Sequence, residues 1–331
     1  MLLVTAAVSA WLRPYEPSPN VVASGLVGDG VLWPLRLWDY EHYLALSQYW
    51  YPEGVVTGHY AFFPLFPAIL AAGGGTTGAA VVGTIVALAA SAAVFVGVSI
   101  ANPLASVRRT AIALACLPKS YVLLLAYPDG LALAGAVFAW ILATRGRWTW
   151  AAVLGVVAAT ARPNGFLIAI PLFFLARRAH GDGAARWVAV AAPPLAFVAV
   201  LTYFWQRSGD PFAYTTAQET WVTGDRWDIL KTPFASPALF WEATLATLAV
   251  VLCILAWRSR LSRAWPAYAT AIVAMSFASG SVDGMGRRML LAFPLVWVAA
   301  SARWFGRAWA FAALGACLSV IFMLTMVTQI P

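Results

Sequence analysis

The sequence predicts an all-α polytopic membrane protein, with one domain covering residues 1–331. Mean hydropathy is +0.78 over 331 residues, and apolar segments recur along the whole chain rather than in one core. Only 10% of the residues are charged, and the arginines gather in short segments between the apolar ones. We therefore expect about ten to twelve transmembrane helices.

The apolar segments give the candidate crossings. After an apolar N-terminal stretch, MLLVTAAVSAWL, they run over 61–75, 78–101, 110–126, 130–144, 149–161, 165–176, 187–206, 238–256, 265–279, 289–302 and 308–328. Several are shorter than the roughly 20 residues of a straight crossing, so neighbours are expected to merge, tilt or enter part-way. Two apolar segments, 61–75 and 78–101, precede Arg108/Arg109, but the arginine pattern requires only one crossing between the first outer loop and that cytoplasmic loop. We therefore expect 61–75 to lie in the interface or turn back.

Arginine groups predict the orientation. They occupy short loops separated by alternate crossings: Arg108/Arg109, Arg145/Arg147, Arg177/Arg178/Arg186, Arg258/Arg260/Arg263 and Arg303/Arg307. The positive-inside rule makes these loops cytoplasmic. The outer side then receives 12 of the 13 carboxylates and two long loops, 13–60 and 207–237. Acidic residues contribute little to topology, so this segregation indicates a chemical site on the outer face.

The remaining composition excludes several classes. The net charge of +8 does not indicate a nucleic-acid partner, because loop arginines beside an anionic leaflet account for it. The cysteines, Cys116, Cys253 and Cys317, are isolated and form neither a disulfide framework nor a zinc site. The chain shows no internal repeat of the kind that many transporters contain.

The first outer loop contains LWDYEHYLALSQYW at 37–50. On a helix, Asp39 and His42 are three residues apart and share a face, with Trp38 beside them. An amphipathic helix lying on the outer interface would direct both side chains toward the membrane surface. Asp39 is therefore a candidate catalytic carboxylate, and the alternative is an ordinary solvated acidic loop.

Two further stretches lie at the outer boundary. In AFFPLFP, the prolines favour a kinked helix start whose aromatic side chains, Phe62, Phe63 and Phe66, face lipid chains or an isoprenoid; interfacial packing is the alternative. In AYPDG, Asp129 is an ionisable residue at membrane depth, which indicates a functional site. A Pro-Asp-Gly turn is the alternative there.

Three arginines depart from the positive-inside pattern. Arg162 in ARPNG and the pair Arg287 and Arg288 in GMGRRML lie at the outer ends of their segments. A guanidinium group there suits a lipid phosphate, because its fork binds two phosphate oxygens. Snorkelling toward the interface is the alternative.

This set of groups suits glycosyl transfer from a lipid-phosphate sugar. One carboxylate takes the proton of the attacking hydroxyl. The leaving phosphate needs positive charge and no acid. A glycosidase would instead need two carboxylates.

The motifs resemble the second mannosyltransferase of GPI-anchor synthesis and its bacterial relatives, which belong to the GT-C superfamily. Six matches follow in order along the chain: WDYEHY, AFFPLFP, LPKSYVLLLAYPDG, RPNG, GDPFAYTTAQETW and RRMLLAFPLVW. In the third match, Asp129 stands where the family has glutamate, and Pro128 where it has serine. The resemblance covers residues 38–297.

The resemblance implies a GT-C helical bundle with interfacial helices in its first extracytoplasmic loop. It implies a polyprenyl-phosphate mannose donor, with Asp39 as base or metal-proximal carboxylate. Trp38, His42, Tyr127 and Asp129 would belong to the donor and sugar site, and the phosphate would lie near four further residues: Arg162, Asn164, Arg287 and Arg288.

We therefore expect an inverting mannosyltransferase of the cell membrane whose acceptor is a glycolipid or another hydroxyl compound. Gln218, Glu219 and Trp221 are expected where the acceptor enters. No obligatory metal is expected, because the chain has no dense D-x-D cluster, although Asp39 and His42 could hold a divalent cation. The alternatives are a GT-C transferase for another sugar or for a protein acceptor, and a lipid flippase or permease without catalysis.

Overall fold

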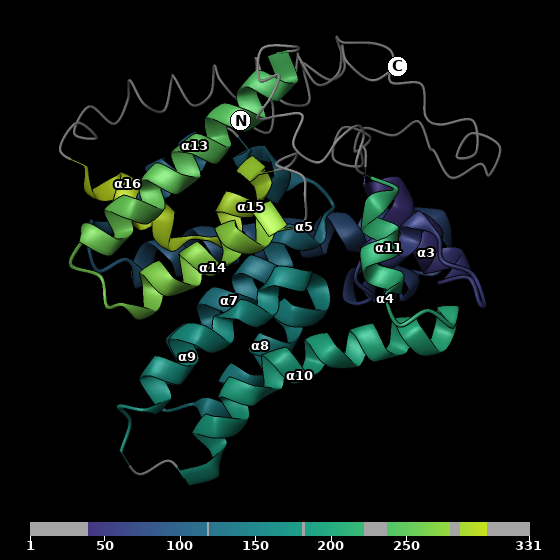
Figure 1. Cartoon of the computed structure of the whole chain (residues 1–331), viewed down its shortest axis with the longest axis horizontal. Helices are drawn as coiled ribbons and strands as arrows, with labels where there is room; N and C mark the ends of the chain where they lie inside the picture. Colours follow the sequence, from purple (N-terminus) through teal and green to yellow (C-terminus); the bar gives the residue numbers. More distant parts are fainter. Residues whose placement is uncertain (1–38, 118, 181–182, 222–236, 279–284, 303–331) are drawn as a thin grey trace.

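A computed structural model describes residues 39–117, 119–180, 183–221, 237–278 and 285–302 (Figure 1). Every regular element in these ranges is helical, which confirms the predicted all-α class. The elements are α3 Tyr40–Tyr49, η2 Gly58–Ala61, α4 Leu65–Ala71, α5 Gly75–Ala101, α6 Val107–Cys116, η3 Ser120–Leu124, α7 Pro128–Thr144, α8 Trp148–Ala161, η4 Pro163–Ile168, α9 Ala169–Ala176, α10 Gly183–Ser208, α11 Ala213–Glu219, α13 Pro237–Arg258, α14 Ala264–Ala278, α15 Met285–Leu291 and α16 Pro294–Ser301.

Within the described ranges, α5 and α10 are long and apolar enough to cross a membrane. The apolar side chains of α10 point largely outward, with Leu195 65% exposed and Val198 54% exposed. The core helix of a soluble protein would bury such residues, so their exposure favours a lipid environment. The expected count of ten to twelve crossings stays a prediction.

Proline divides several of the expected segments into shorter helices. Segment 61–75 contains the last residue of η2 and then α4, with Pro64 directly before α4. Segment 289–302 contains the end of α15 and then α16, with Pro294 at the first position of α16. Proline has no N–H to donate within a helix, but it fits the first turn of a new one. Continuous apolar stretches therefore become pairs of short helices here.

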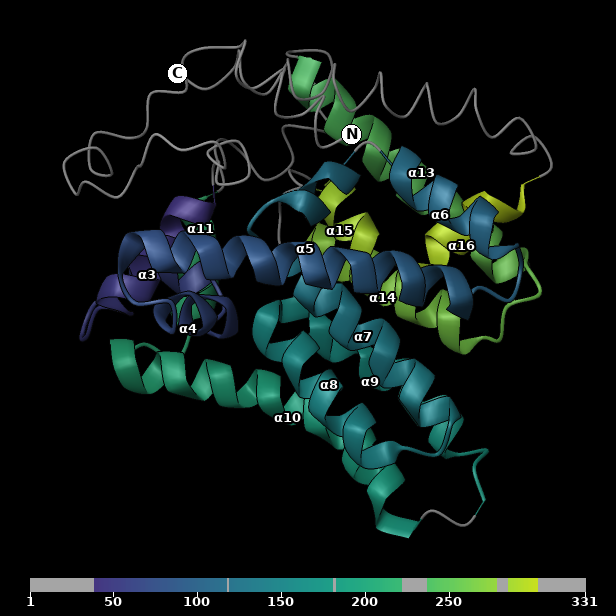
Figure 2. The same cartoon turned by 180° about the vertical axis from the view of Figure 1, so that it is seen from behind.

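Helices α7, α8 and α10 pack together below α5 when the molecule is seen from behind (Figure 2). Helix α10 changes direction along its length, and it contains Pro193 and Pro194 in its interior (Figure 1). Interior prolines remove helical hydrogen bonds and produce such bends. The bent helix reaches from the end of the molecule near α9 to the group formed by α3, α4 and α11 (Figure 1).

Two hydrophobic cores hold the helices together. The larger core joins α5–α9 to α13–α16 and includes Leu133 and Trp297. The smaller core is rich in aromatic residues and joins α3, η2, α4, η3, α10 and α11 around Tyr43, Tyr60 and Phe204. Burial of these large side chains fixes the first-loop helix α3 against the bundle.

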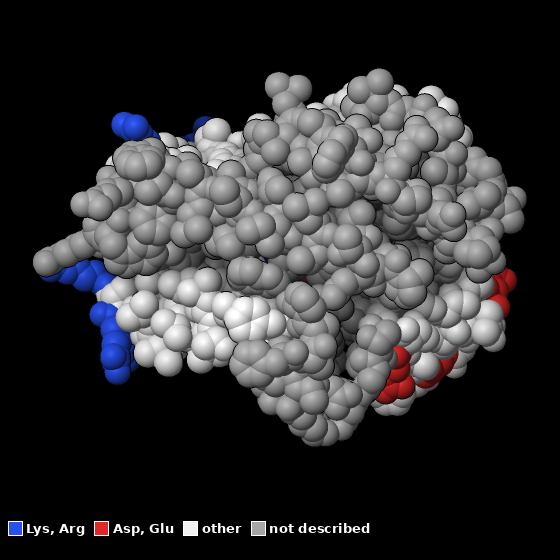
Figure 3. Space-filling view, turned by 90° about the horizontal axis from the view of Figure 1, so that it is seen from above, with Lys and Arg blue, Asp and Glu red and all other residues white. Residues whose placement is uncertain are grey.

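Charges separate along the long axis of the described surface. Lys and Arg side chains are visible at one end and Asp and Glu side chains at the other (Figure 3). The exposed acidic residues include Glu53 and Glu219, near α3 and α11, whereas exposed arginines such as Arg145 and Arg258 end α7 and α13. The arrangement agrees with the segregation of charge that the sequence indicates.

A close backbone approach positions η4 on α8. A Cβ atom at Gly165 would lie 2.0 Å from the carbonyl oxygen of Ala158. We expect Gly165→Ala to displace η4 and to cost about 1–3 kcal/mol of stability, measured as a lower melting temperature of the purified protein in detergent. Gly130→Ala is the matched control, because its nearest neighbour, Ala90 Cβ, is 3.4 Å away. An unchanged melting temperature for Gly165→Ala would contradict the tight packing.

Candidate active site

Asp39 immediately precedes α3, and its backbone N–H donates to the hydroxyl of Tyr127 at 3.0 Å. This hydrogen bond joins the first-loop helix to the start of α7. The Asp39 side chain is 32% exposed, so its carboxylate is accessible and yet held in the protein. Trp38, which the sequence places in the same site, lies outside the described residues.

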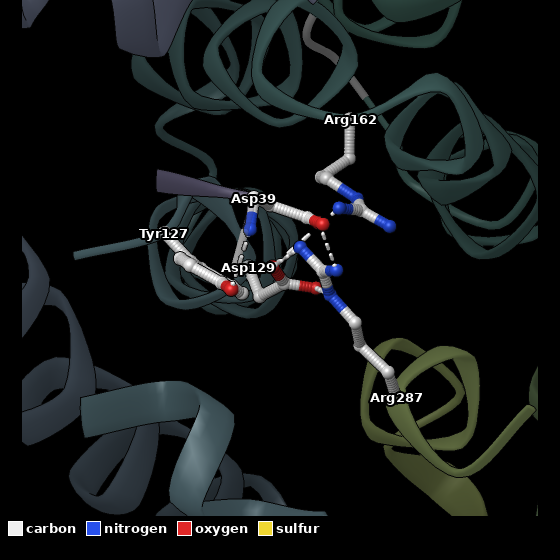
Figure 4. A network of polar contacts seen from close by, with 5 residues as sticks. All are labelled: Asp39, Tyr127, Asp129, Arg162 and Arg287. Carbon is white, nitrogen blue, oxygen red and sulfur yellow. Dashed lines mark hydrogen bonds and ion pairs between the residues drawn. The ribbon is translucent and has the colours of Figure 1, made fainter. Parts of the chain in front are cut away.

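Arg287, in α15, bridges two carboxylates (Figure 4). Its Nη1 donates to Asp39 Oδ2 at 2.5 Å, while Nε and Nη2 donate to the two oxygens of Asp129 at 2.9 and 2.7 Å. Its guanidinium carbon also lies 4.7 Å from the centre of the Tyr127 ring. Paired N–H···O bonds and the aromatic face fix the orientation of the guanidinium plane.

Asp129 lies in the first turn of α7, directly after Pro128. A carboxylate at this position is favoured by the partial positive charge of the helix N-terminus. The side chain is only 1% exposed and receives both Arg287 and Arg162. It therefore lies behind the arginines, and its assignment to the donor and sugar site stays a prediction.

Arg162 lies between α8 and η4 and extends toward the same point as Arg287 from the other side (Figure 4). Its Nη1 is 3.5 Å from Asp129 Oδ2, a much looser contact than those of Arg287. Its Nε is buried without a hydrogen-bond partner among the residues that the structure describes. Arg162 thus retains donors that a ligand can use.

Asp39, Arg162 and Arg287 border a cavity of about 430 Å³. Its walls come from the start of α3, η2 and its flank, η3, the α8–η4 turn, α11, α14 and α15. The cavity brings together ten of the residues singled out from the sequence: Asp39, Phe62, Phe63, Tyr127, Arg162, Asn164, Gln218, Trp221, Arg287 and Arg288. A volume of this size accommodates a small molecule or a sugar.

Four residues singled out from the sequence do not line this cavity: His42, Phe66, Asp129 and Glu219. Phe66 is fully buried in the aromatic core against Tyr43, so it does not contact lipid, contrary to expectation. Glu219 is exposed at the end of α11.

His42 packs within an aromatic cluster beside the cavity. Its ring stacks on Phe62 at 5.0 Å and meets Trp221 edge-on at 4.8 Å, with the His59 ring 5.7 Å away. Burial lowers the pKa of His42, and the charge of Asp39 opposes this effect while His59 adds to it. Burial also lowers the pKa of His59. Both rings therefore favour the neutral form, which suits a packing role.

Sequence reasoning did not place Lys119 or Glu242 in the site. Lys119 lines the cavity, and its Nζ lies 2.9 Å from Glu242 Oε1, with both side chains nearly buried. The available signal was that Lys119 is one of only two lysines among 21 basic residues and lies, like Glu242, in an apolar segment. Three buried or half-buried tyrosines of the lining were also missed: Tyr43, Tyr121 and Tyr214.

The charges around the cavity nearly balance. Four cations, Lys119, Arg162, Arg287 and Arg288, face three carboxylates, Asp39, Asp129 and Glu242, so this set carries a net charge of +1. Over the ranges given above, no group of three or more His, Cys, Asp or Glu side chains could hold a metal ion. Arg287 occupies the space between two carboxylates where a cation could otherwise lie. The expectation that no metal is obligatory stays a prediction.

Comparisons of this chain with protein-family models, with curated proteins and with solved structures find no match. The functional interpretation therefore rests on the residues and their geometry.

The buried Lys119–Glu242 pair gives a test of stability. Lys119→Met leaves the Glu242 carboxylate buried without its cation, and we expect a loss of about 3–5 kcal/mol, seen as a lower melting temperature. The double variant Lys119→Met/Glu242→Leu is expected to recover most of it, because an apolar pair leaves no unpaired charge. Glu53→Gln is the exposed control, since Glu53 pairs with Arg207 but is 70% exposed. Equal losses in the single and double variants would contradict a coupled pair.

The two half-buried histidines, His42 and His59, predict acid sensitivity. Their pKa values are lower in the folded state than in the unfolded state, so the unfolded state binds more protons as the pH falls below about 6.5. Stability is then fully present above that pH and is lost on acidification. We expect the melting temperature to fall between about pH 7 and about pH 5, and less so in His42→Gln/His59→Gln. His180→Gln, which removes the exposed third histidine, should keep the wild-type dependence.

Proposed function

We propose that this chain is a multi-pass membrane glycosyltransferase of the GT-C type. In this proposal it moves mannose from polyprenyl-phosphate mannose to a hydroxyl of a lipid-linked or glycolipid acceptor, with inversion, on the extracytoplasmic face. One observation carries the proposal: a single cavity combines a partly exposed carboxylate, Asp39, with Arg162, Arg287 and Arg288. No second carboxylate is exposed beside Asp39 among the described lining residues, which favours phosphate rather than a protonated alcohol as the leaving group.

The arginines provide for the phosphate in two ways. Arg287 is held rigidly by Asp129 and presents an oriented guanidinium group, because three of its N–H groups already donate to carboxylates. Arg162 is the less neutralised of the two and retains a buried Nε donor without a partner in the described part of the chain. The net charge of +1 carried by the seven described groups around the cavity complements a phosphodiester, which carries one negative charge. Charge that develops on the leaving phosphate would meet preorganised donors.

Asp39 is positioned to act as the base. Arg287 donates to its Oδ2, and no other described side chain donates to this carboxylate. In the proposed reaction the acceptor oxygen attacks the anomeric carbon, and the bond from that carbon to the phosphate oxygen breaks. The hydroxyl proton passes to Asp39, and the polyprenyl phosphate leaves with the bonding electron pair. A single displacement of this kind inverts the anomeric configuration.

The lining also suits a lipid-linked substrate. Phe62 and Phe63 form an apolar wall and are nearly buried, while Gln218 and Trp221 lie at the α11 side, where we place the acceptor.

The distribution of charge supports an extracytoplasmic location for the cavity. Exposed carboxylates lie at the end of the molecule near α3 and α11, and exposed arginines lie at the other end (Figure 3). A panel of polyprenyl-phosphate sugars, assayed in proteoliposomes with glycolipid and peptide acceptors, separates mannosyl transfer from transfer of another sugar or transfer to protein.

Asp39→Asn tests the proposed base. The amide keeps the shape of the carboxylate and cannot take a proton, so we expect transfer of labelled mannose from polyprenyl-phosphate mannose to membrane lipids to fall by at least about 100-fold. Glu53→Gln, which changes an exposed carboxylate of the same loop, is the matched control. Both variants should be inserted and should show similar melting temperatures. Near wild-type turnover by Asp39→Asn would exclude this role, and a lipid flippase or permease would then become the better interpretation.

A further inference from the structure

Asn164 is a buried residue of the cavity lining whose amide oxygen has no hydrogen-bond partner in the part of the chain that the structure describes. Its side chain is 7% exposed and lines the cavity wall. Its Oδ1 accepts no hydrogen bond from any residue in the described ranges. A buried acceptor left in this state is costly, so its place in a cavity wall indicates a bound group that donates to it.

The local backbone fixes the direction of this amide. Pro163 begins η4, the N–H of Gly165 donates to Arg162 O at 3.0 Å, and the missing Cβ of Gly165 lets η4 lie directly on α8. The stretch RPNG therefore holds Arg162 and Asn164 on one turn against the same cavity. This placement is part of the fold and does not depend on a mobile surface side chain.

The chemistry of the amide indicates which part of a substrate it contacts. The motif resemblance implies that Asn164 contacts the lipid phosphate. The oxygens of a phosphodiester, however, have no proton at neutral pH and cannot donate to Oδ1. A hydroxyl group can donate to Oδ1 and can also accept from Nδ2. A sugar next to a phosphate held by Arg162 offers such hydroxyls at short range.

We propose that Asn164 recognises a ring hydroxyl of the transferred hexose and is a specificity-determining residue for the donor. This inference rests on the proposed function. Arg162 then binds the phosphate, and Asn164, two residues later, distinguishes the sugar attached to it. A site whose buried polar group requires a hydroxyl discriminates strongly against an analogue that lacks it.

The test measures binding to the full chain in nanodiscs by calorimetry. The ligands are short-chain polyprenyl-phosphate mannose, its 2-, 3-, 4- and 6-deoxy analogues, and the same polyprenyl phosphate without sugar. We expect one deoxy analogue to bind the wild-type protein about tenfold more weakly than the mannosyl compound, the effect of losing one hydrogen bond. Asn164→Ala should bind the mannosyl compound more weakly than the wild-type protein does, by about the same factor. Its affinity for that deoxy analogue should equal the affinity of the wild-type protein for the analogue.

Two variants accompany Asn164→Ala. Thr160→Val is the matched control, because the Thr160 hydroxyl donates to Val156 O at 2.7 Å and lies outside the cavity lining; it should keep the wild-type ranking of analogues. Asn164→Asp keeps an acceptor at the same place. It should keep the sensitivity to the same missing hydroxyl, while its negative charge weakens binding of the sugar-free phosphate as well.

The outcomes separate the two proposals. Equal weakening of the sugar-free phosphate and the mannosyl compound in Asn164→Ala would place Asn164 at the phosphate and overturn the inference, while leaving the proposed transferase intact. An unchanged ranking of deoxy analogues in Asn164→Ala would also overturn it. Failure of the wild-type protein to bind either polyprenyl compound would overturn the proposed function and this inference together.

Discussion

The site depends on one guanidinium group shared between two carboxylates. Arg287 donates to Asp39 and, with two hydrogen bonds, to the almost fully buried Asp129. A buried Asp129 without this partner would be strongly unfavourable, so the ion pair determines where α15 lies relative to α7. The same contact brings Asp39, and with it the start of α3, to the cavity. Structure and chemistry therefore rest on the same three side chains.

Around this centre, each polar group has a distinct physical setting. Arg287 donates three of its five N–H groups to carboxylates. Arg162 Nε is a donor without a partner in the described residues, and Asn164 Oδ1 is an acceptor without one. Such differences are typical of sites in which some groups orient the others and some contact the ligand. The aromatic cluster around His42 and Phe62 closes the α3 side, and the Lys119–Glu242 pair lies behind the η3 side.

The sequence predicted the helical class, the approximate limits of most helices, and ten of the residues that line the cavity. These came from hydropathy, proline positions and isolated charges at segment ends, all of which are local signals. It did not predict that Asp129 lies behind the arginines, that Phe66 is buried, or that Lys119 faces the cavity. Those facts depend on contacts between residues far apart in the chain, which no local pattern records.

The separation of these contacts along the chain has a consequence for biosynthesis. Asp39 and Arg287, which are joined in the site, are 248 positions apart. Helix α3 leaves the ribosome long before α15 is made. Until α15 is inserted, the Asp39 carboxylate has no Arg287 to pair with. The enzyme that we propose can thus become competent only after nearly all of its polypeptide has been translated and inserted, and a shortened product would hold an incomplete centre.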